Sequence, residues 1–175
     1  MPARLSHWFA PPELRPIDAI HCNRCAMMEL IWSYRILSAA VLFLAFHKGE
    51  EPERLVAGIL LTATIADFVN HALFGDPAFF ALNPGHLVID SWTLIALLWV
   101  ALRANRGWPM WACAAQLILM VAHAAKLTEL SLVRFGYFAM TQLPVIIQTV
   151  ALLTGTIAHI RRTERLGRYH AWRLT

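Results

Sequence analysis

Charged side chains are scarce in this sequence. Asp, Glu, Lys and Arg together make up 15% of its 175 residues, whereas hydrophobic residues make up 58%. A water-soluble domain of this length normally carries more charge, and the mean hydropathy of +0.53 agrees with this imbalance. The composition therefore argues against a water-soluble domain and favours a single integral membrane domain.

Several motifs that would identify an activity are also absent. The chain has no glycine-rich nucleotide-binding motif, no internal repeat, no low-complexity tract and no recognisable catalytic motif. Its net charge of +4 does not predict nucleic-acid binding, because the basic residues lie largely at the ends of hydrophobic stretches. We expect no cleavable signal peptide, because the first hydrophobic stretch begins only near Met28. The sequence alone does not indicate whether the protein is an enzyme.

Cysteine is scarce too, with three residues in the chain. Cys22 and Cys25 form a CxxC pair directly after His21. Such a pair can form or exchange a disulfide, and together with His21 it could bind a soft metal. A structural zinc site needs four ligands, and no second CxxC is present. Cys22 and Cys25 are a candidate redox pair, with incidental thiols or one local disulfide as the alternative.

Long hydrophobic stretches are abundant, and each is close to the ~20 residues that a helix needs to cross a bilayer. Backbone polar groups in lipid must be satisfied within the segment, so such stretches predict helices. We therefore predict an all-α integral membrane protein, a compact bundle of about five transmembrane helices. The stretches are Met28–Phe46, Leu55–Phe74, His86–Leu102, Trp108–Ala125 and Gly136–Ile160.

Basic residues between the stretches predict the orientation. They occur in the first and third connections and in the tail, whereas residues 75–85 contain no Lys or Arg. The positive-inside rule then places the N-terminus outside and the C-terminus in the cytoplasm, in a bacterial inner membrane. Residues 1–27 form an extramembrane arm, residues 28–160 the bundle and residues 161–175 a basic cytoplasmic tail. The basic residues concerned are Lys48, Arg54, Arg103, Arg106 and the arginines from Arg161 onward.

Polar residues within the stretches gather toward the predicted outer face. A helix rises about 1.5 Å per residue, so depths on antiparallel helices can be compared. Ionisable residues inside a membrane are costly and point to function by default. This polar band consists of Glu29 and Arg35, then Asp67, Asn70 and His71, then His86 and Asp90, then Gln116, His123 and Lys126, and finally Thr141 and Gln142.

Imidazoles and carboxylates in this band predict a site. Asp67 and His71 are four residues apart and share a helix face. We predict a metal site formed by His71, Asp90 and His123, with Asp67 and Asn70 in support. Alternatively, His71 and His123 could ligate a haem from opposite sides. The sequence does not identify the cofactor.

A proton or ion path is another function that the band permits. It would run through Asp67, Asn70, Asp90, His123, Lys126 and Gln142. The structural alternative is that these side chains join helices, at about 1 kcal/mol or less per hydrogen bond. In that case Lys126 would extend its ammonium group to the membrane surface.

Two functions remain open on this reading. The first is an accessory or scaffold subunit of a membrane assembly, indicated by the small size and by rows of small residues such as Gly58, Thr62 and Ala66. Its partners would be the lipid bilayer and either other membrane subunits or a second copy, with no nucleic acid. The second is a metal- or haem-binding or proton- or ion-conducting protein that uses the polar band.

Overall fold

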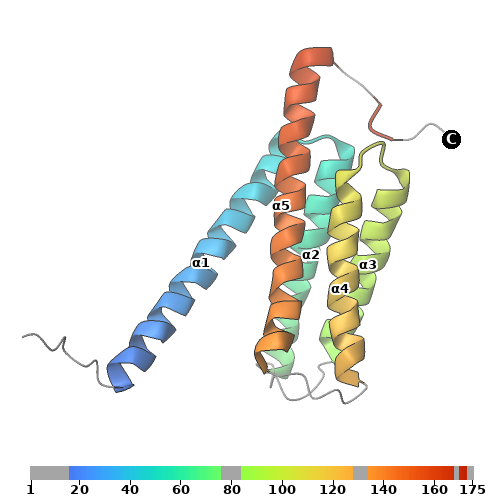
Figure 1. The fold of residues 1–175 in the computed structure, drawn as a ribbon. Coiled ribbons are helices and arrows are strands. Elements are labelled where there is room, and N and C mark those ends of the chain that lie inside the picture. The colour runs from blue at the N-terminus through green and yellow to red at the C-terminus, as the bar shows by residue number, and fades with distance from the viewer. Residues whose placement is uncertain (1–15, 76–83, 128–133, 168–169, 173–175) are drawn as a thin grey trace, which may run out of the picture. The chain divides into compact units, whose positions relative to one another are not determined.

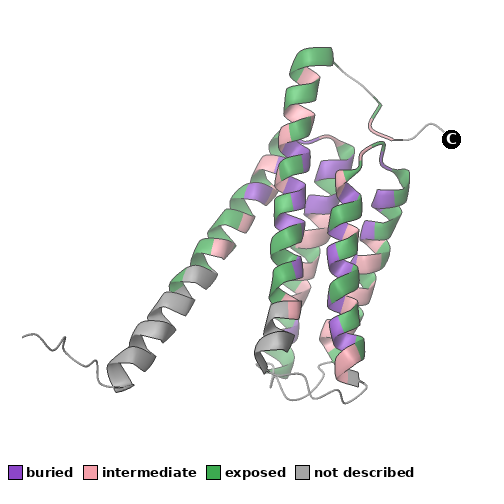
Figure 2. Cartoon of the chain, viewed as in Figure 1, coloured by how far each residue is buried: buried purple, intermediate pink, exposed green. Residues whose placement is uncertain are grey.

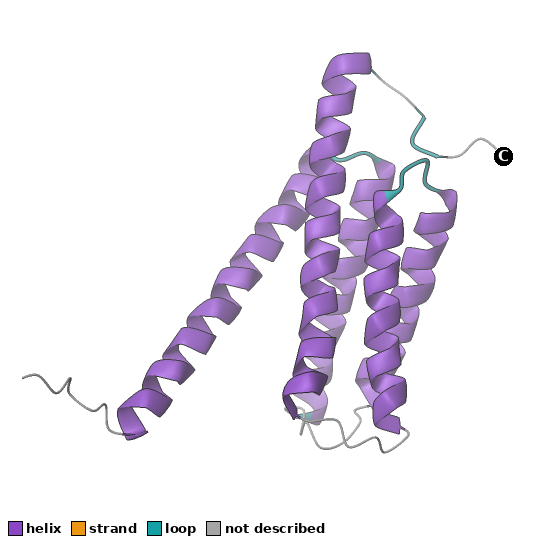
Figure 3. Cartoon of the chain, viewed as in Figure 1, coloured by secondary structure: helices purple, strands orange, loops and turns teal. Residues whose placement is uncertain are grey.

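The computed structural model describes residues 16–75, 84–127, 134–167 and 170–172, with side chains for Glu29 and for residues 32–75, 84–126, 140–167 and 170–172. Five helices contain nearly all of these residues (Figures 1 and 3). They are α1 (Pro16–Lys48), α2 (Glu51–Phe74), α3 (Pro84–Arg103), α4 (Trp108–Leu127) and α5 (Arg134–Leu166). The all-helical prediction is confirmed for the part of the chain that the structure describes.

Four helices are long and apolar enough to cross a membrane when the described residues are considered. The four segments are Glu51–Phe74, Pro84–Arg103, Trp108–Lys126 and Met140–Leu166. Helix α1 is not among them, since its side chains are described continuously only from Trp32 onward. A fifth span through α1 stays a prediction.

The chain divides into two compact units, Met1–Ala39 and Ala40–Thr175. The described part of the first unit belongs to α1, which begins at Pro16 and so ahead of the hydrophobic stretch. In this unit the Ser33 hydroxyl donates to the backbone carbonyl of Glu29 at 2.7 Å, one helical turn away. Cys22 and Cys25 lie within α1, and their side chains are outside the described residues.

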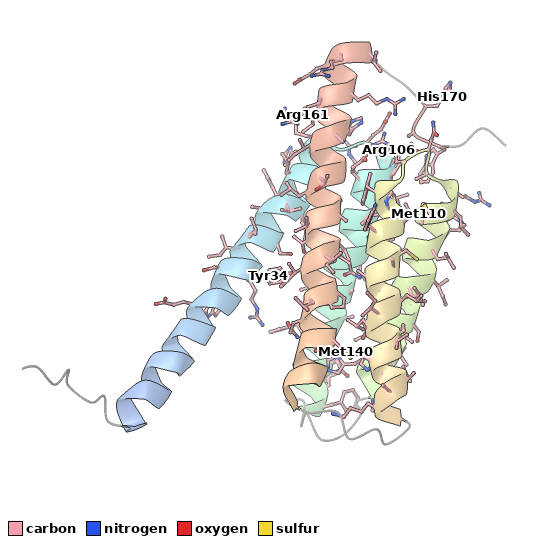
Figure 4. All side chains as sticks on the ribbon, viewed as in Figure 1. Tyr34, Arg106, Met110, Met140, Arg161 and His170 are labelled. Atoms are coloured by element: carbon pink, nitrogen blue, oxygen red, sulfur yellow. The ribbon has the colours of Figure 1, made fainter. Side chains whose placement is uncertain are left out.

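The second unit contains an antiparallel bundle of α2, α3, α4 and α5. Helix α2 packs against α3, α3 against α4, and α4 against α5, and α2 also contacts α5 (Figure 1). At one end of the bundle, α2 and α4 end where α3 and α5 begin, and we call this the polar end. Met140 lies toward the polar end, whereas Arg106 and Met110 lie toward the opposite end (Figure 4).

Small and branched residues fill the core of the second unit. Buried positions concentrate on the helix sides that face one another, and exposed positions lie outside (Figure 2). Helices α4 and α5 approach closely at Gly155, where an added Cβ would lie 2.4 Å from the Trp108 indole. The buried core comprises Val41, Ala45, Val56, Ala57, Leu97, Val100, Ala104, Ala112, Ala151 and Leu152. Large apolar side chains cover the outside, as a helix bundle in lipid requires.

A group of charged residues closes the end opposite the polar end, and we call it the collar. Arg106, in the α3–α4 connection, contacts Glu53 and lies 2.6 Å from Glu50 through its Nη2. The Trp108 indole donates to Glu53 Oε1 at 3.2 Å, and His159 Nδ1 lies 3.8 Å from Glu50 Oε2. Glu53 is fully buried, so these contacts compensate a charge that would otherwise be costly.

The C-terminal segment docks beside the collar. The backbone N–H of Asn105 donates to the carbonyl of Ala171 at 3.0 Å. The Trp172 indole donates to the carboxylate of Glu51 and packs edge-on against Trp99, with ring centroids 5.8 Å apart. These contacts hold part of the predicted tail against the bundle.

Candidate functional site

Three metal-ligand side chains meet between α2 and α3 at the polar end, and we call them the triad. Asp67 and His71 lie one turn apart on α2, and His86 lies in the first turn of α3. His86 Nδ1 is 2.9 Å from Asp67 Oδ1, and His71 Nε2 is 3.5 Å from the same oxygen. The two imidazole rings stand 5.0 Å apart between centroids, tilted by 60°. The carboxylate thus lies within reach of both imidazoles.

The end of α2 orients His71. Its Nδ1 lies 3.4 Å from the carbonyl oxygen of Gly75, and the N–H of Gly75 donates to the His71 carbonyl at 2.9 Å. Gly75 has φ of +81°, a conformation that favours glycine. Donation from Nδ1 to this carbonyl leaves the Nε2 lone pair directed toward Asp67. Such a contact on the second ring nitrogen is common for histidines that ligate metals.

The spacing of the triad fits a transition metal. One ligand atom from each residue lies within 4.8 Å of the others. Among the described residues, no other set of three His, Cys, Asp or Glu side chains meets this criterion. Metal–nitrogen and metal–oxygen bonds of about 2.0–2.1 Å in a tetrahedral site separate ligands by about 3.3 Å. The distances of 2.9 and 3.5 Å lie on either side of this value. Metal binding would replace the proton that His86 Nδ1 shares with Asp67.

A second polar group joins α3, α4 and α5 in the bundle interior, and we call it the network. Asp90 Oδ2 lies 2.8 Å from His123 Nε2, and Asp90 Oδ1 accepts from Gln116 Nε2 at 3.1 Å. Gln148 on α5 donates to Gln116 Oε1 at 2.5 Å. One carboxylate is therefore bound by two side chains of α4, and α5 is linked to it through Gln116.

Two buried atoms near the polar end have no hydrogen-bond partner among the described residues. They are Nδ1 of His123 and Nδ2 of Asn70. In the network the Asp90 carboxylate orients the His123 imidazole, as a carboxylate does in an acid–base or metal-binding pair. The network can therefore hold a proton, and it can equally serve as the joint between three helices.

The structure divides the predicted metal ligands between the two groups. His71 belongs to the triad, whereas Asp90 and His123 pair with each other in the network. Asp67, predicted as a supporting residue, lies in the triad itself. Haem ligation by His71 and His123 stays a prediction.

Three other predicted residues of the second unit, Asn70, Lys126 and Gln142, lie at the same end of the bundle. Asn70 is buried on α2, one turn after Asp67, and Lys126 is in the last turn of α4. Gln142 is exposed near the start of the described side chains of α5. The proposed path through these residues remains a prediction, as does the redox role of Cys22 and Cys25.

Sequence reasoning left out three important partners. His86 was grouped with the polar band but not with the metal ligands, although it lies four residues before Asp90 in the sequence. Gln148 and the collar residue Glu53 were not recognised. Gln148 is an amide side chain within an apolar stretch, and this signal could have identified it.

Comparison of the chain with protein families, with curated proteins and with solved structures found no match. The site must therefore be interpreted from its own chemistry.

Proposed function

We propose that this protein is an integral membrane protein that binds one divalent transition-metal ion at the triad. The observation that carries the proposal is the convergence of Asp67, His71 and His86, whose ligand atoms lie within 4.8 Å of one another. Two imidazoles and one carboxylate suit zinc, iron, cobalt, nickel or copper better than magnesium or calcium, which prefer oxygen ligands. Three protein ligands leave a coordination position open, as in sites that take an exogenous ligand.

Electrostatics also supports a cation at this place. A carboxylate near a hydrocarbon region is costly unless it is compensated. His71 lies in the last turn of α2, where the negative end of the helix dipole favours positive charge. A divalent ion would compensate both the carboxylate and the carbonyl groups at the end of this helix.

The proposal includes a membrane topology. Helix α1 would provide a fifth span, with the N-terminus outside and the C-terminus in the cytoplasm of a bacterial inner membrane. Support comes from Arg103, Arg106 and the arginines Arg161, Arg162 and Arg165, which lie toward the end opposite the triad. The triad would then lie near the outer face, where it can meet metal ions from outside the cell.

Metal titration of the purified protein tests this function. Isothermal titration calorimetry with Zn²⁺, and Co²⁺ absorption spectra, should give one site per chain in a maltoside detergent. His71→Ala and His86→Ala should each weaken binding by more than the ~10–100-fold that loss of a supporting group causes. His170→Ala, at an exposed position of the docked tail, should bind as the unaltered protein does. Equal affinity in all four proteins would disprove the proposal.

A second role, as an accessory subunit of a membrane assembly, is favoured by α2. A Cβ added at Gly58 would meet nothing within 4 Å, and Thr62, one turn later, is exposed. This part of the small-residue row is therefore open to another helix. Native mass spectrometry after mild solubilisation tests this role. The unaltered protein should carry a partner that Gly58→Leu loses. A bare monomer for both proteins would argue against an assembly role.

A further inference from the structure

We propose that the open coordination position at the triad takes a phosphoryl oxygen, supplied by a phospholipid headgroup. The proposal rests on metal binding at the triad and names the chemical class of the exogenous ligand. It follows from the charge of the triad with its metal ion, from the side chains near the triad and from the depth of the triad along the helices.

The charge of the loaded site favours an anion. Within the triad, two neutral imidazoles, one carboxylate and one divalent ion sum to a charge of about +1, and a bound cation is commonly the largest local charge in a site. The Asp90 carboxylate, which also acts on His86, is held by Gln116 and His123 in the network. The positive end of the α3 dipole adds to this, because α3 begins at Pro84, two residues before His86, and has no acidic residue in its first turn. An anionic oxygen at the fourth position would neutralise the site.

The surroundings of the triad are apolar and open. The Asp67 side chain is 45% exposed, and those of His71 and His86 are 26% and 23% exposed. Phe68, next to Asp67, and Phe74, at the end of α2, are 74% and 76% exposed. The metal position therefore lies at a partly exposed edge between α2 and α3, on a helix whose exposed apolar side chains suit lipid.

The depth of the triad matches the headgroup layer. His71 lies three residues before the end of α2, and His86 two residues after the start of α3. At about 1.5 Å per residue, these positions are about 5 Å and 3 Å from the helix ends. A helix of 20 residues such as α3 spans the ~30 Å hydrocarbon core. Its first turn therefore lies where the phosphate groups of lipids begin.

Phosphorus-31 electron–nuclear double resonance on Cu²⁺-loaded protein tests the proposal. The full chain is loaded with one equivalent of Cu²⁺ in three environments, namely phosphate-free maltoside, nanodiscs of phosphatidylglycerol and nanodiscs of a phosphate-free glycolipid. A fourth sample contains inorganic phosphate in maltoside. The His71→Ala, His86→Ala double variant reports copper bound elsewhere, and His170→Ala is the matched control.

A phosphorus coupling in phosphatidylglycerol nanodiscs is expected, together with its absence in maltoside and in glycolipid. The double variant should lose this coupling, and His170→Ala should keep it. A coupling that appears with inorganic phosphate in maltoside but not with phosphatidylglycerol would overturn the lipid source and assign free phosphate. Copper bound by two imidazole nitrogens without phosphorus coupling in any sample would overturn the inference and leave metal binding intact. No copper at the triad in any sample would overturn both proposals.

Discussion

His86 Nδ1 lies 2.9 Å from Asp67 Oδ1, and the two residues belong to the consecutive antiparallel helices α3 and α2. This contact joins the end of α2 to the start of α3, and His71 Nε2 lies 3.5 Å from the same oxygen. A metal ion at this place would replace a hydrogen-bonded proton and link α2 and α3 more firmly. The following measurements separate this role from that of an ordinary interhelical contact.

Metal should stabilise the folded protein through the triad. A ligand at 100 times its dissociation constant adds about 2.7 kcal/mol to the free energy of unfolding, which raises the Tm of a protein of this size by about 5–10 °C. We expect Zn²⁺ to produce such a shift in detergent and a chelator to reverse it. Asp67→Asn should abolish the shift and His170→Ala should keep it. An equal shift in Asp67→Asn would mean that the metal binds elsewhere.

The network should contribute to stability through coupling between Asp90 and His123. Hydrogen bonds between membrane helices are worth about 0.6–2 kcal/mol, and a double-mutant cycle isolates the pairwise part. We expect Asp90→Asn and His123→Gln each to lower the free energy of unfolding, with a coupling of about 1 kcal/mol. Steric-trap unfolding in bicelles measures it. A coupling of zero would show that the 2.8 Å contact adds nothing to folding.

Gly155 should not tolerate a side chain. A Cβ at this position would lie 2.4 Å from the Trp108 ring, so α4 and α5 would have to separate. Overpacking of this kind typically costs about 1–3 kcal/mol. Thermal unfolding of Gly155→Ala in detergent should therefore show a clear loss of stability.

Gly58→Ala is the matched control for this substitution. Nothing lies within 4 Å of its added Cβ, and alanine favours a helix over glycine by about 1 kcal/mol. The control should be neutral or slightly stabilising. An unchanged stability of Gly155→Ala would mean that helix α5 and Trp108 have room to adjust. An equal loss in both variants would mean that the loss does not come from the Trp108 contact.

Loss of the ion pair between Glu53 and Arg106 in the collar should destabilise the protein. Removal of one partner of a buried ion pair costs about 3–5 kcal/mol, because the remaining charge is left uncompensated. We expect Glu53→Ala to destabilise the protein strongly, since Glu53 is fully buried against Arg106. Arg54→Ala, at an exposed neighbouring position, should have little effect. Equal unfolding temperatures of the two variants would contradict this account of the collar.

Hydropathy was sufficient to predict the helices of the bundle. The predicted stretches Leu55–Phe74, His86–Leu102 and Trp108–Ala125 each lie within α2, α3 and α4. The position of the polar residues of α2, α3 and α4 at one end of the bundle could be predicted as well, because it depends only on the rise per residue and the alternation of direction. The pairing of Asp67 with His71 followed from four-residue spacing.

The choice of partners across helices could not be predicted. One residue of helix corresponds to a rotation of about 100°, so depth alone does not decide whether His71 faces Asp90 or His86. The collar was missed for a different reason. Arg106 was read as a topology signal, and its pairing with Glu53 joins the α3–α4 connection to the first turn of α2, 53 residues earlier.

That separation has a consequence for biogenesis. Ribosomes add about 5–20 residues per second, so Glu53 is synthesised about 3–10 s before Arg106. During this interval Glu53 has no partner from the α3–α4 connection. The hairpin that begins with α2 thus cannot complete the collar alone. The collar can form only after Arg106 and Trp108, which follow α3, have been made.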